Sequence, residues 1–159
     1  MRHGDRRPTQ QRGFTYVMLL VAIALVGAAL AALGPMWAEQ AQREREQELL
    51  RVGELYARAI QTYRESSPGS LKRYPTTLGD LLLDTRFVGT RRHLRRLYAD
   101  PLDPQRPWGL VRAADGGVAG VYSLDPRQPW RRNLLVNDVL ELPAATRYDD
   151  WKFTPKPRS

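Results

Sequence analysis

The chain contains no cysteine and only two histidines among its 159 residues. Without cysteine it can form no disulfide, no thiolate nucleophile and no cysteine-ligated zinc site. His93 is the only histidine beyond the first 13 residues, and it is expected to be a surface residue among arginines. No serine lies in the strained turn that presents a hydrolase nucleophile. We therefore expect no catalytic site, no cofactor and no small-molecule substrate, and predict that the protein is not an enzyme.

Metal and phosphate sites are also poorly supported by the sequence. Asp100 and Asp103 are the best pair of carboxylates, three residues apart in a loop bounded by prolines. Their spacing does not match an EF-hand, and Asp-Pro loops mostly form turns. The glycines around Gly116 predict a turn, because no strand, glycine loop and helix follow one another there. We expect no bound metal ion.

The net charge is +8, but the positive residues are not gathered in one stripe. The first 13 residues carry +3, and the remaining arginines are mixed with acidic residues. Aromatic side chains near arginines can stack on nucleic-acid bases, although packing in a core accounts for them more simply. The tryptophans in question are Trp108, Trp130 and Trp151. Nucleic-acid binding is therefore not expected.

One long apolar run stands out, from Phe14 to Leu33, and it contains no charged residue. A helix of this length spans roughly 30 Å, the thickness of the hydrocarbon core of a bilayer. The segment before it, residues 1–13, is basic, and basic flanks stay on the cytoplasmic side. The sequence predicts a single transmembrane helix with the N-terminus in the cytoplasm and a small head outside.

The apolar run also fits three alternatives. A secretory signal peptide has the same basic start and apolar centre, with a possible cleavage site at residues 29–31. An unprocessed signal anchor would also fit. A helix buried in a soluble core fits less well, because so small a head could not surround it.

After Gly34-Pro35, where proline favours a kink, residues 36–66 favour a continued helix. Apolar residues recur there at steps of three and four, which marks one face for burial. This stripe consists of Leu49, Val52, Tyr56, Ala59, Ile60 and Tyr63. We predict one helix from about Phe14 to Glu65, the second half of which packs on a sheet formed by the residues that follow.

The head, residues 67–150, contains one clear hairpin signal. Residues 108–114 and 118–124 are apolar and flank Asp115-Gly116-Gly117, and an Asp-Gly pair suits a tight hairpin turn. A third strand is predicted within residues 133–142. A short helix over residues 91–98 would expose four arginines and turn Leu94, Leu97 and Tyr98 inward. The predicted fold class is α+β, a long N-terminal helix packed on a small antiparallel sheet.

Gly13 directly precedes Phe14, between the basic segment and the apolar run. The stretch RGFTYVMLLVAIALVG resembles the prepilin leader junction of type IV pilins and of the pseudopilins of type II secretion systems. The resemblance implies cleavage after Gly13 by a prepilin peptidase and N-methylation of the new terminus at Phe14. A residue without a side chain suits a site that must enter a protease as an extended strand.

The family usually carries a glutamate where this chain has Met18. In the filament that carboxylate is thought to neutralise the terminal amine of a neighbouring subunit within an apolar bundle, where an unpaired charge is costly. The departure at Met18 therefore indicates either a minor subunit or assembly with partners by another arrangement, and it disfavours the role of the abundant filament subunit. Assembly would proceed through the N-terminal helix, with Thr15, Met18 and Pro35 in the assembling segment.

A weaker resemblance extends into the head. The stretches YPTTLGDLL, RRLYADPL and WGLV with GGVAGVYSL are similar to the heads of proteins related to the major pseudopilin of type II secretion. In the major pseudopilins themselves, a calcium loop near the C-terminus is usual. Here Asp125 and Asn137 lie among arginines, which repel a cation, and no such loop is recognised.

The resemblance implies a pilin-like architecture and a minor pseudopilin or pilin-like subunit. It divides the chain into a basic prepilin leader (1–13), a transmembrane half-helix (14–35), an amphipathic half-helix (36–66), a periplasmic head (67–150) and a frayed C-terminal tail (151–159). The implied location is a bacterial inner membrane, and the implied partners are other pilin or pseudopilin subunits, an assembly platform and the peptidase. The alternative is an unprocessed, membrane-anchored periplasmic adaptor.

Overall fold

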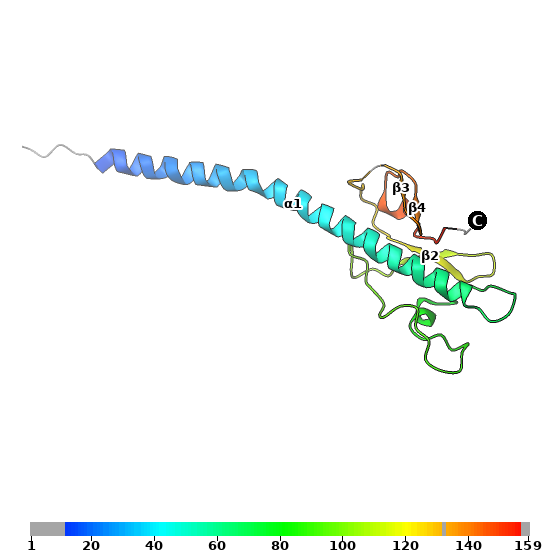
Figure 1. Ribbon diagram of the computed structural model, residues 1–159. Helices are drawn as coiled ribbons and strands as arrows, with labels where there is room; N and C mark the ends of the chain where they lie inside the picture. Colours follow the sequence, from blue (N-terminus) through cyan, green and yellow to red (C-terminus); the bar gives the residue numbers. More distant parts are fainter. Residues whose placement is uncertain (1–11, 132, 157–159) are drawn as a thin grey trace, which may run out of the picture. The chain divides into compact units, whose positions relative to one another are not determined.

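The computed structural model describes residues 12–131 and 133–156, with only the backbone described at residues 12–13 and 31–36. The chain forms two compact units, Met1–Ala41 and Gln42–Ser159. The described elements are helix α1 (Arg12–Glu65), the 3-10 turn η1 (Leu78–Leu81), strands β1 (Gly109–Arg112), β2 (Val118–Tyr122), β3 (Leu135–Val136) and β4 (Glu141–Leu142), and the 3-10 turn η2 (Tyr148–Asp150) (Figure 1). The fold class is α+β, as predicted from the sequence.

Helix α1 confirms the predicted helix of Phe14 to Glu65 to within two residues at its start. Its assignment continues across Gly34-Pro35, so Pro35 does not end the helix. The kink predicted at this point stays a prediction, and the side chain of Pro35 lies outside the described residues.

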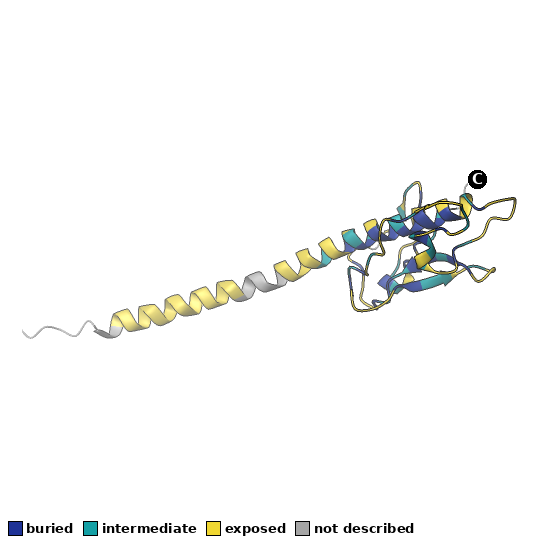
Figure 2. Ribbon diagram, turned by 90° about the horizontal axis from the view of Figure 1, so that it is seen from below, coloured by how far each residue is buried: buried dark blue, intermediate teal, exposed yellow. Residues whose placement is uncertain are grey.

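In the first unit, every side chain from Phe14 to Leu30 is exposed (Figure 2). Within the part of the chain that the structure describes, no helix is both long enough and apolar enough to cross a membrane. The predicted span continues through residues 31–35, whose side chains lie outside that part.

In the second unit, α1 buries the predicted stripe completely. All six of its residues have 7% or less of their surface exposed. They form a core with side chains of the hairpin and of the C-terminal segment, among them Val118, Val121, Trp151 and Phe153. Burial of a large apolar side chain contributes about 1.5–3 kcal/mol, so this stripe is the main attachment of the head to its helix.

The predicted hairpin is confirmed. Strands β1 and β2 pair antiparallel, with Gly109 opposite Tyr122 and a bulge between Val111 and Arg112. At the turn Gly116 has a φ of 79°, a conformation that side chains disfavour. The Asp115 carboxylate accepts a hydrogen bond from the Gly117 amide at 3.0 Å, which fixes the turn.

The prediction of a strand within residues 133–142 is confirmed, although the segment forms two strands rather than one. These strands are a pair separate from the first hairpin, in which β3 runs antiparallel to β4. The cause is Asn137, whose side-chain oxygen accepts hydrogen bonds from the amides of Val139 and Leu140 at 2.9 and 2.7 Å. This turn folds the segment back on itself before it can extend the first hairpin.

The short helix predicted over residues 91–98 is wrong, because the backbone there is not helical. The amides of His93 and Leu94 both donate to the carbonyl of Leu81, and the amide of Tyr98 donates to the Tyr56 hydroxyl. These distant partners replace the local bonds of a helix. Leu94 is buried as predicted, whereas Leu97 is 47% exposed.

The expectation of a frayed C-terminal end fails for residues 151–156. Trp151 and Phe153 are buried, and Phe153 forms an antiparallel bridge with Val121 of β2. The Phe153 amide donates to the Val121 carbonyl at 2.8 Å, and the Lys156 amide donates to the Val139 carbonyl at 2.8 Å. Aromatic burial and backbone pairing outweigh the loosening effect of the prolines.

Candidate functional site

The predicted cleavage site lies in the first turn of α1. Because the helix begins at Arg12, the backbone of Gly13 is helical. A protease that reads an extended strand would need this first turn to unwind, which costs little at a helix end, where few hydrogen bonds are satisfied. Phe14, the implied new terminus, is 72% exposed.

The segment after Phe14 presents apolar side chains on all sides. Met18 is 62% exposed, and no charged residue occurs between Phe14 and Leu33. Thr15 lies one residue after Phe14 on the same helix. Such a surface suits an apolar environment rather than water, because burying it releases about 25 cal/mol for each Å² removed from solvent.

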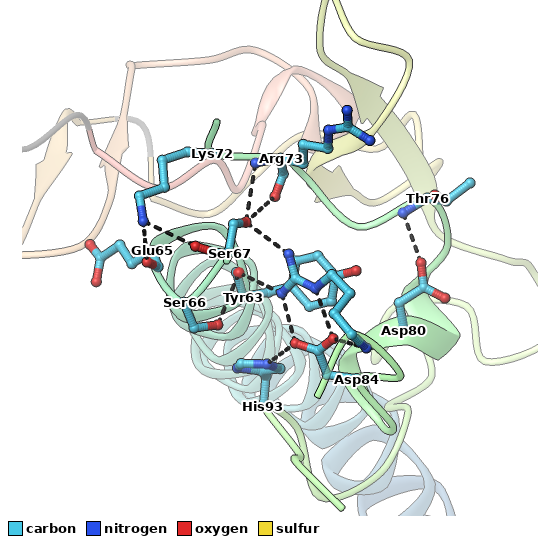
Figure 3. Close-up of polar contacts among 11 residues, drawn as sticks. Tyr63, Glu65, Ser66, Ser67, Lys72, Arg73, Thr76, Asp80, Asp84 and His93 are labelled. Atoms are coloured by element: carbon cyan, nitrogen blue, oxygen red, sulfur yellow. Dashed lines mark hydrogen bonds and ion pairs between the residues drawn. The ribbon is translucent and has the colours of Figure 1, made fainter. Parts of the chain in front are cut away.

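In the head, a polar cluster surrounds Asp84, whose side chain is fully buried (Figure 3). Its carboxylate accepts hydrogen bonds from Arg86 Nε at 2.8 Å and Nη2 at 2.7 Å. His93 Nε2 lies 3.0 Å from the same carboxylate. The hydrogen bonds from Arg86, and then the one with His93, hold the pKa of Asp84 well below its usual range.

Arg86 connects this cluster to the C-terminal end of α1. Its guanidinium donates to the Ser67 hydroxyl at 2.7 Å and to the Tyr63 carbonyl at 2.9 Å, and lies 3.6 Å from the centre of the Tyr63 ring. Lys72 donates to the carbonyls of Glu65 and Ser67 just beyond. Cations at a helix C-terminus satisfy its free carbonyls and complement its dipole, so the cluster fastens the loop to the helix.

His93 is not the surface residue that the sequence predicted, because its side chain is only 1% exposed. The sequence contains no sign that His93 is buried, because His93 and its partner Asp84 both lie in loops. No helical or strand periodicity relates the two positions. The cluster does not form a serine hydrolase triad. Ser67 Oγ contacts Arg86 and the backbone of Arg73, while His93 contacts Asp84.

A second cluster surrounds Glu46, which is 4% exposed on α1. Its carboxylate accepts hydrogen bonds from the amides of Trp130 and Arg131 at 2.6 and 3.0 Å, and from the Tyr148 hydroxyl at 2.8 Å. Burial, reinforced by the Glu46 charge, raises the pKa of Tyr148 to about 12. One carboxylate thus holds two separate loops on the helix.

Between the end of β2 and Trp130, the loop contains an ion pair of Arg127 with Asp125. Arg127 Nη2 donates to Asp125 at 2.6 Å, and Nε lies within 3.0 Å of both carboxylate oxygens. Burial would raise the pKa of Asp125, but the hydrogen bonds and charge of Arg127 outweigh it, so the pKa is lowered. The Arg127 guanidinium thus contacts both Asp125 oxygens, which a metal ion would need as ligands.

No family of proteins, curated protein or solved structure matches the chain. In the head, two buried carboxylates, Asp84 and Glu46, hold loops against α1, and in the first unit an apolar helix surface is exposed.

The remaining candidates from the sequence are separated by the fold. Asp100 is buried and accepts hydrogen bonds from the Ser123 hydroxyl at 2.5 Å and the Leu102 amide at 2.9 Å. Asp103 pairs with Arg106 on the surface. The two carboxylates therefore have separate hydrogen-bonding and ion-pair partners. Within residues 12–131 and 133–156, no three histidine, aspartate or glutamate side chains gather as metal ligands would.

Of the three tryptophans considered for nucleic-acid stacking, two instead pack in the core, which is the simpler explanation from the sequence. Trp108 and Trp151 are buried, and Trp108 Nε1 donates to the Tyr98 carbonyl at 2.7 Å. Trp130 is 52% exposed, with the Arg43 guanidinium 3.8 Å from its ring centre. That stacking covers part of the aromatic surface that a nucleic-acid base would need.

Proposed function

We propose that the protein is a minor pseudopilin or pilin-like structural subunit of a type II secretion or type IV pilus-like machine. Its leader is removed after Gly13, Phe14 is N-methylated, and the subunit assembles through its N-terminal helix. One observation carries the proposal: the uncharged, exposed apolar surface of α1 begins immediately after the glycine that ends a basic leader.

The exposed apolar surface of α1 is suited to two successive environments, first the membrane and then the assembled filament. Every side chain from Phe14 to Leu30 is exposed, which amounts to a continuous apolar patch far larger than soluble monomers tolerate. A bacterial inner membrane would first hold the helix, with its N-terminus in the cytoplasm and the head in the periplasm. Equivalent helices of other subunits would then replace the lipid after extraction by the assembly platform.

Met18 supports a minor role. No side chain from Phe14 to Leu33 can neutralise the terminal amine of a neighbour, because the segment has no carboxylate. Burial of an unpaired amine costs several kcal/mol, which disfavours a repeated stack of this subunit on itself. A position with few copies in each assembly avoids that cost.

The head fits a structural role because its buried polar groups fix loops to α1. The Asp84 and Glu46 clusters each join segments that are far apart in the sequence. Because these contacts hold the head to the second half of α1, its exposed loops keep a fixed position relative to that part of the helix.

The decisive experiment is mass spectrometry of the protein from cells that contain a prepilin peptidase. The proposal expects a mature chain that begins with N-methylated Phe14. In Gly13→Val the bulkier residue should block cleavage and leave the precursor. Gly27→Val is the matched control, because a Cβ at Gly27 would meet no atom within 4 Å, and it should be processed normally. An intact Met1, a cut within residues 29–31, or normal processing of Gly13→Val would contradict the proposal.

The helical backbone at Arg12 and Gly13 favours one alternative, an unprocessed, membrane-anchored periplasmic adaptor. In that case α1 would serve only as an anchor, and its first turn would never open. The same mass spectrum separates the two, since the adaptor keeps Met1 in the presence of the peptidase.

A further inference from the structure

The loop between η1 and β1 carries a concentrated positive charge that the rest of the head does not balance. Residues 85–99 contain five arginines and no acidic residue. Asp84 neutralises Arg86. In the described part of the chain the other four are exposed and form no ion pair: Arg91, Arg92, Arg95 and Arg96.

This loop forms one wall of a groove of about 410 Å³, and the opposite wall is α1. Leu55, Leu94 and Tyr98 contribute apolar surface to a lining that also contains arginine, threonine and histidine side chains. A groove of this size accommodates one or two side chains of a bound segment. The groove does not include the Asp84 or Glu46 carboxylate.

The two walls differ in charge. On α1, Arg51 pairs with Glu48 and Arg58 pairs with Glu54, so the helix wall is electrically balanced. On the loop wall Arg95 lines the groove and has no such partner among the described residues. An occupant would therefore need negative charge on the loop side and apolar groups toward the lining.

We propose that this groove binds an acidic polypeptide segment of another protein, with apolar residues between its carboxylates. The inference goes beyond the proposed filament role and does not depend on it. A bilayer surface is flat and would meet the exposed arginines without reaching the groove lining. A second copy of this chain is a poor occupant, because two chains of net charge +8, or +5 without the first 13 residues, repel one another.

A nucleic acid fits less well than an acidic polypeptide. Base recognition in a single strand depends on free aromatic faces. The Tyr98 ring already has the guanidinium of Arg96 at 4.9 Å and that of Arg51 at 5.9 Å from its centre. The apolar part of the lining, to which Leu55 contributes, instead suits leucine-sized side chains.

The test measures fluorescence anisotropy of a labelled peptide of Glu-Glu-Leu repeats against the full chain in neutral detergent. The control peptide has Gln-Gln-Leu repeats.

Three variants of the protein separate the effect of charge from that of shape. Arg95→Glu reverses the charge at the rim of the groove, Thr62→Trp fills the groove without changing its charge, and Arg73→Glu is the matched control. Arg73 is exposed outside the groove, and its side chain forms no ion pair among the described residues. Thermal unfolding of each variant verifies that the head is intact.

The proposal expects the acidic peptide to bind and the amide peptide not to bind. Arg95→Glu and Thr62→Trp should each weaken binding about tenfold, whereas Arg73→Glu should change it less than about twofold. Equal loss in Arg95→Glu and Arg73→Glu would mean a general charge effect and overturn the proposal. Full binding by Thr62→Trp, tighter binding of single-stranded DNA than of the peptide, or no peptide binding would overturn it as well.

Discussion

The ring of Phe153 occupies the space that a side chain at Gly53 of α1 would need, since a Cβ there would lie 2.2 Å from Phe153 Cδ1. The helix therefore approaches the C-terminal segment more closely than any larger residue allows. Phe153 is fully buried at this contact and also continues the pairing of β2 through Val121.

Gly53→Ala should destabilise the head, although alanine favours a helix over glycine. The new methyl group forces the buried ring to move, and such overpacking typically costs about 1–3 kcal/mol. Denaturant unfolding, followed by tryptophan fluorescence, measures the loss. Gly27→Ala lies in the same helix with open space around it and should leave the unfolding midpoint unchanged or raise it. A Gly53→Ala head as stable as the wild type would contradict the close approach.

Asp84→Asn should lower the free energy of unfolding by about 3 kcal/mol, because it leaves the guanidinium of Arg86 without its buried partner. Denaturant unfolding at neutral pH measures the change. Asp103→Asn is the control, since that carboxylate is 36% exposed in its pair with Arg106. It should cost less than about 1 kcal/mol. Equal losses in the two variants would show that burial adds nothing to the Asp84 pair.

The same variant changes the pH dependence of stability. The pKa of Asp84 is lowered in the folded protein, so its contribution is present above the unfolded pKa of about 3.9 and is lost as pH falls toward the folded value. Wild-type stability should therefore fall more steeply than that of Asp84→Asn below about pH 4. Denaturant unfolding at a series of pH values measures both slopes, and parallel curves would show that Asp84 has an ordinary pKa when folded.

Glu46→Gln should loosen the loop at Trp130 and Arg131. The amide keeps one acceptor but loses the charge that strengthens the bonds to both backbone amides, a loss of about 1–2 kcal/mol. Limited trypsin digestion should cut faster after Arg131, read by mass spectrometry of the fragments. Glu141→Gln makes the same chemical change at an exposed surface pair 3.6 Å from Lys156 and should leave the cleavage rate unchanged. Equal rates in the two variants would mean that Glu46 does not hold the loop.

Local patterns predicted the parts of the fold that depend on neighbouring residues. The spacing of Leu49, Tyr56 and Ile60 identified the buried face of α1, and Asp115-Gly116 identified the hairpin turn. Both signals lie within a few residues of the structure they produce.

The errors have a common origin in contacts between distant residues. The segment 91–98 has helical composition, but its amides bond to Leu81 and Tyr56. Glu46 resembles any other surface glutamate of an amphipathic helix, yet its partners lie 84 and 85 residues further along. A single sequence contains no periodic signal for such pairs, so neither the Glu46 nor the Asp84 cluster could be predicted. The proposed cleavage junction and the apolar run, in contrast, each consist of consecutive residues, so a single sequence suffices to recognise them.

The bridge between Phe153 and Val121 also sets the order in which the head can mature during synthesis. Helix α1 and both hairpins leave the ribosome before residues 151–156, yet the core stays open until Trp151 and Phe153 are available to close it. During synthesis the apolar stripe of α1 therefore lacks the cover of these two aromatic side chains until residues 151–156 emerge.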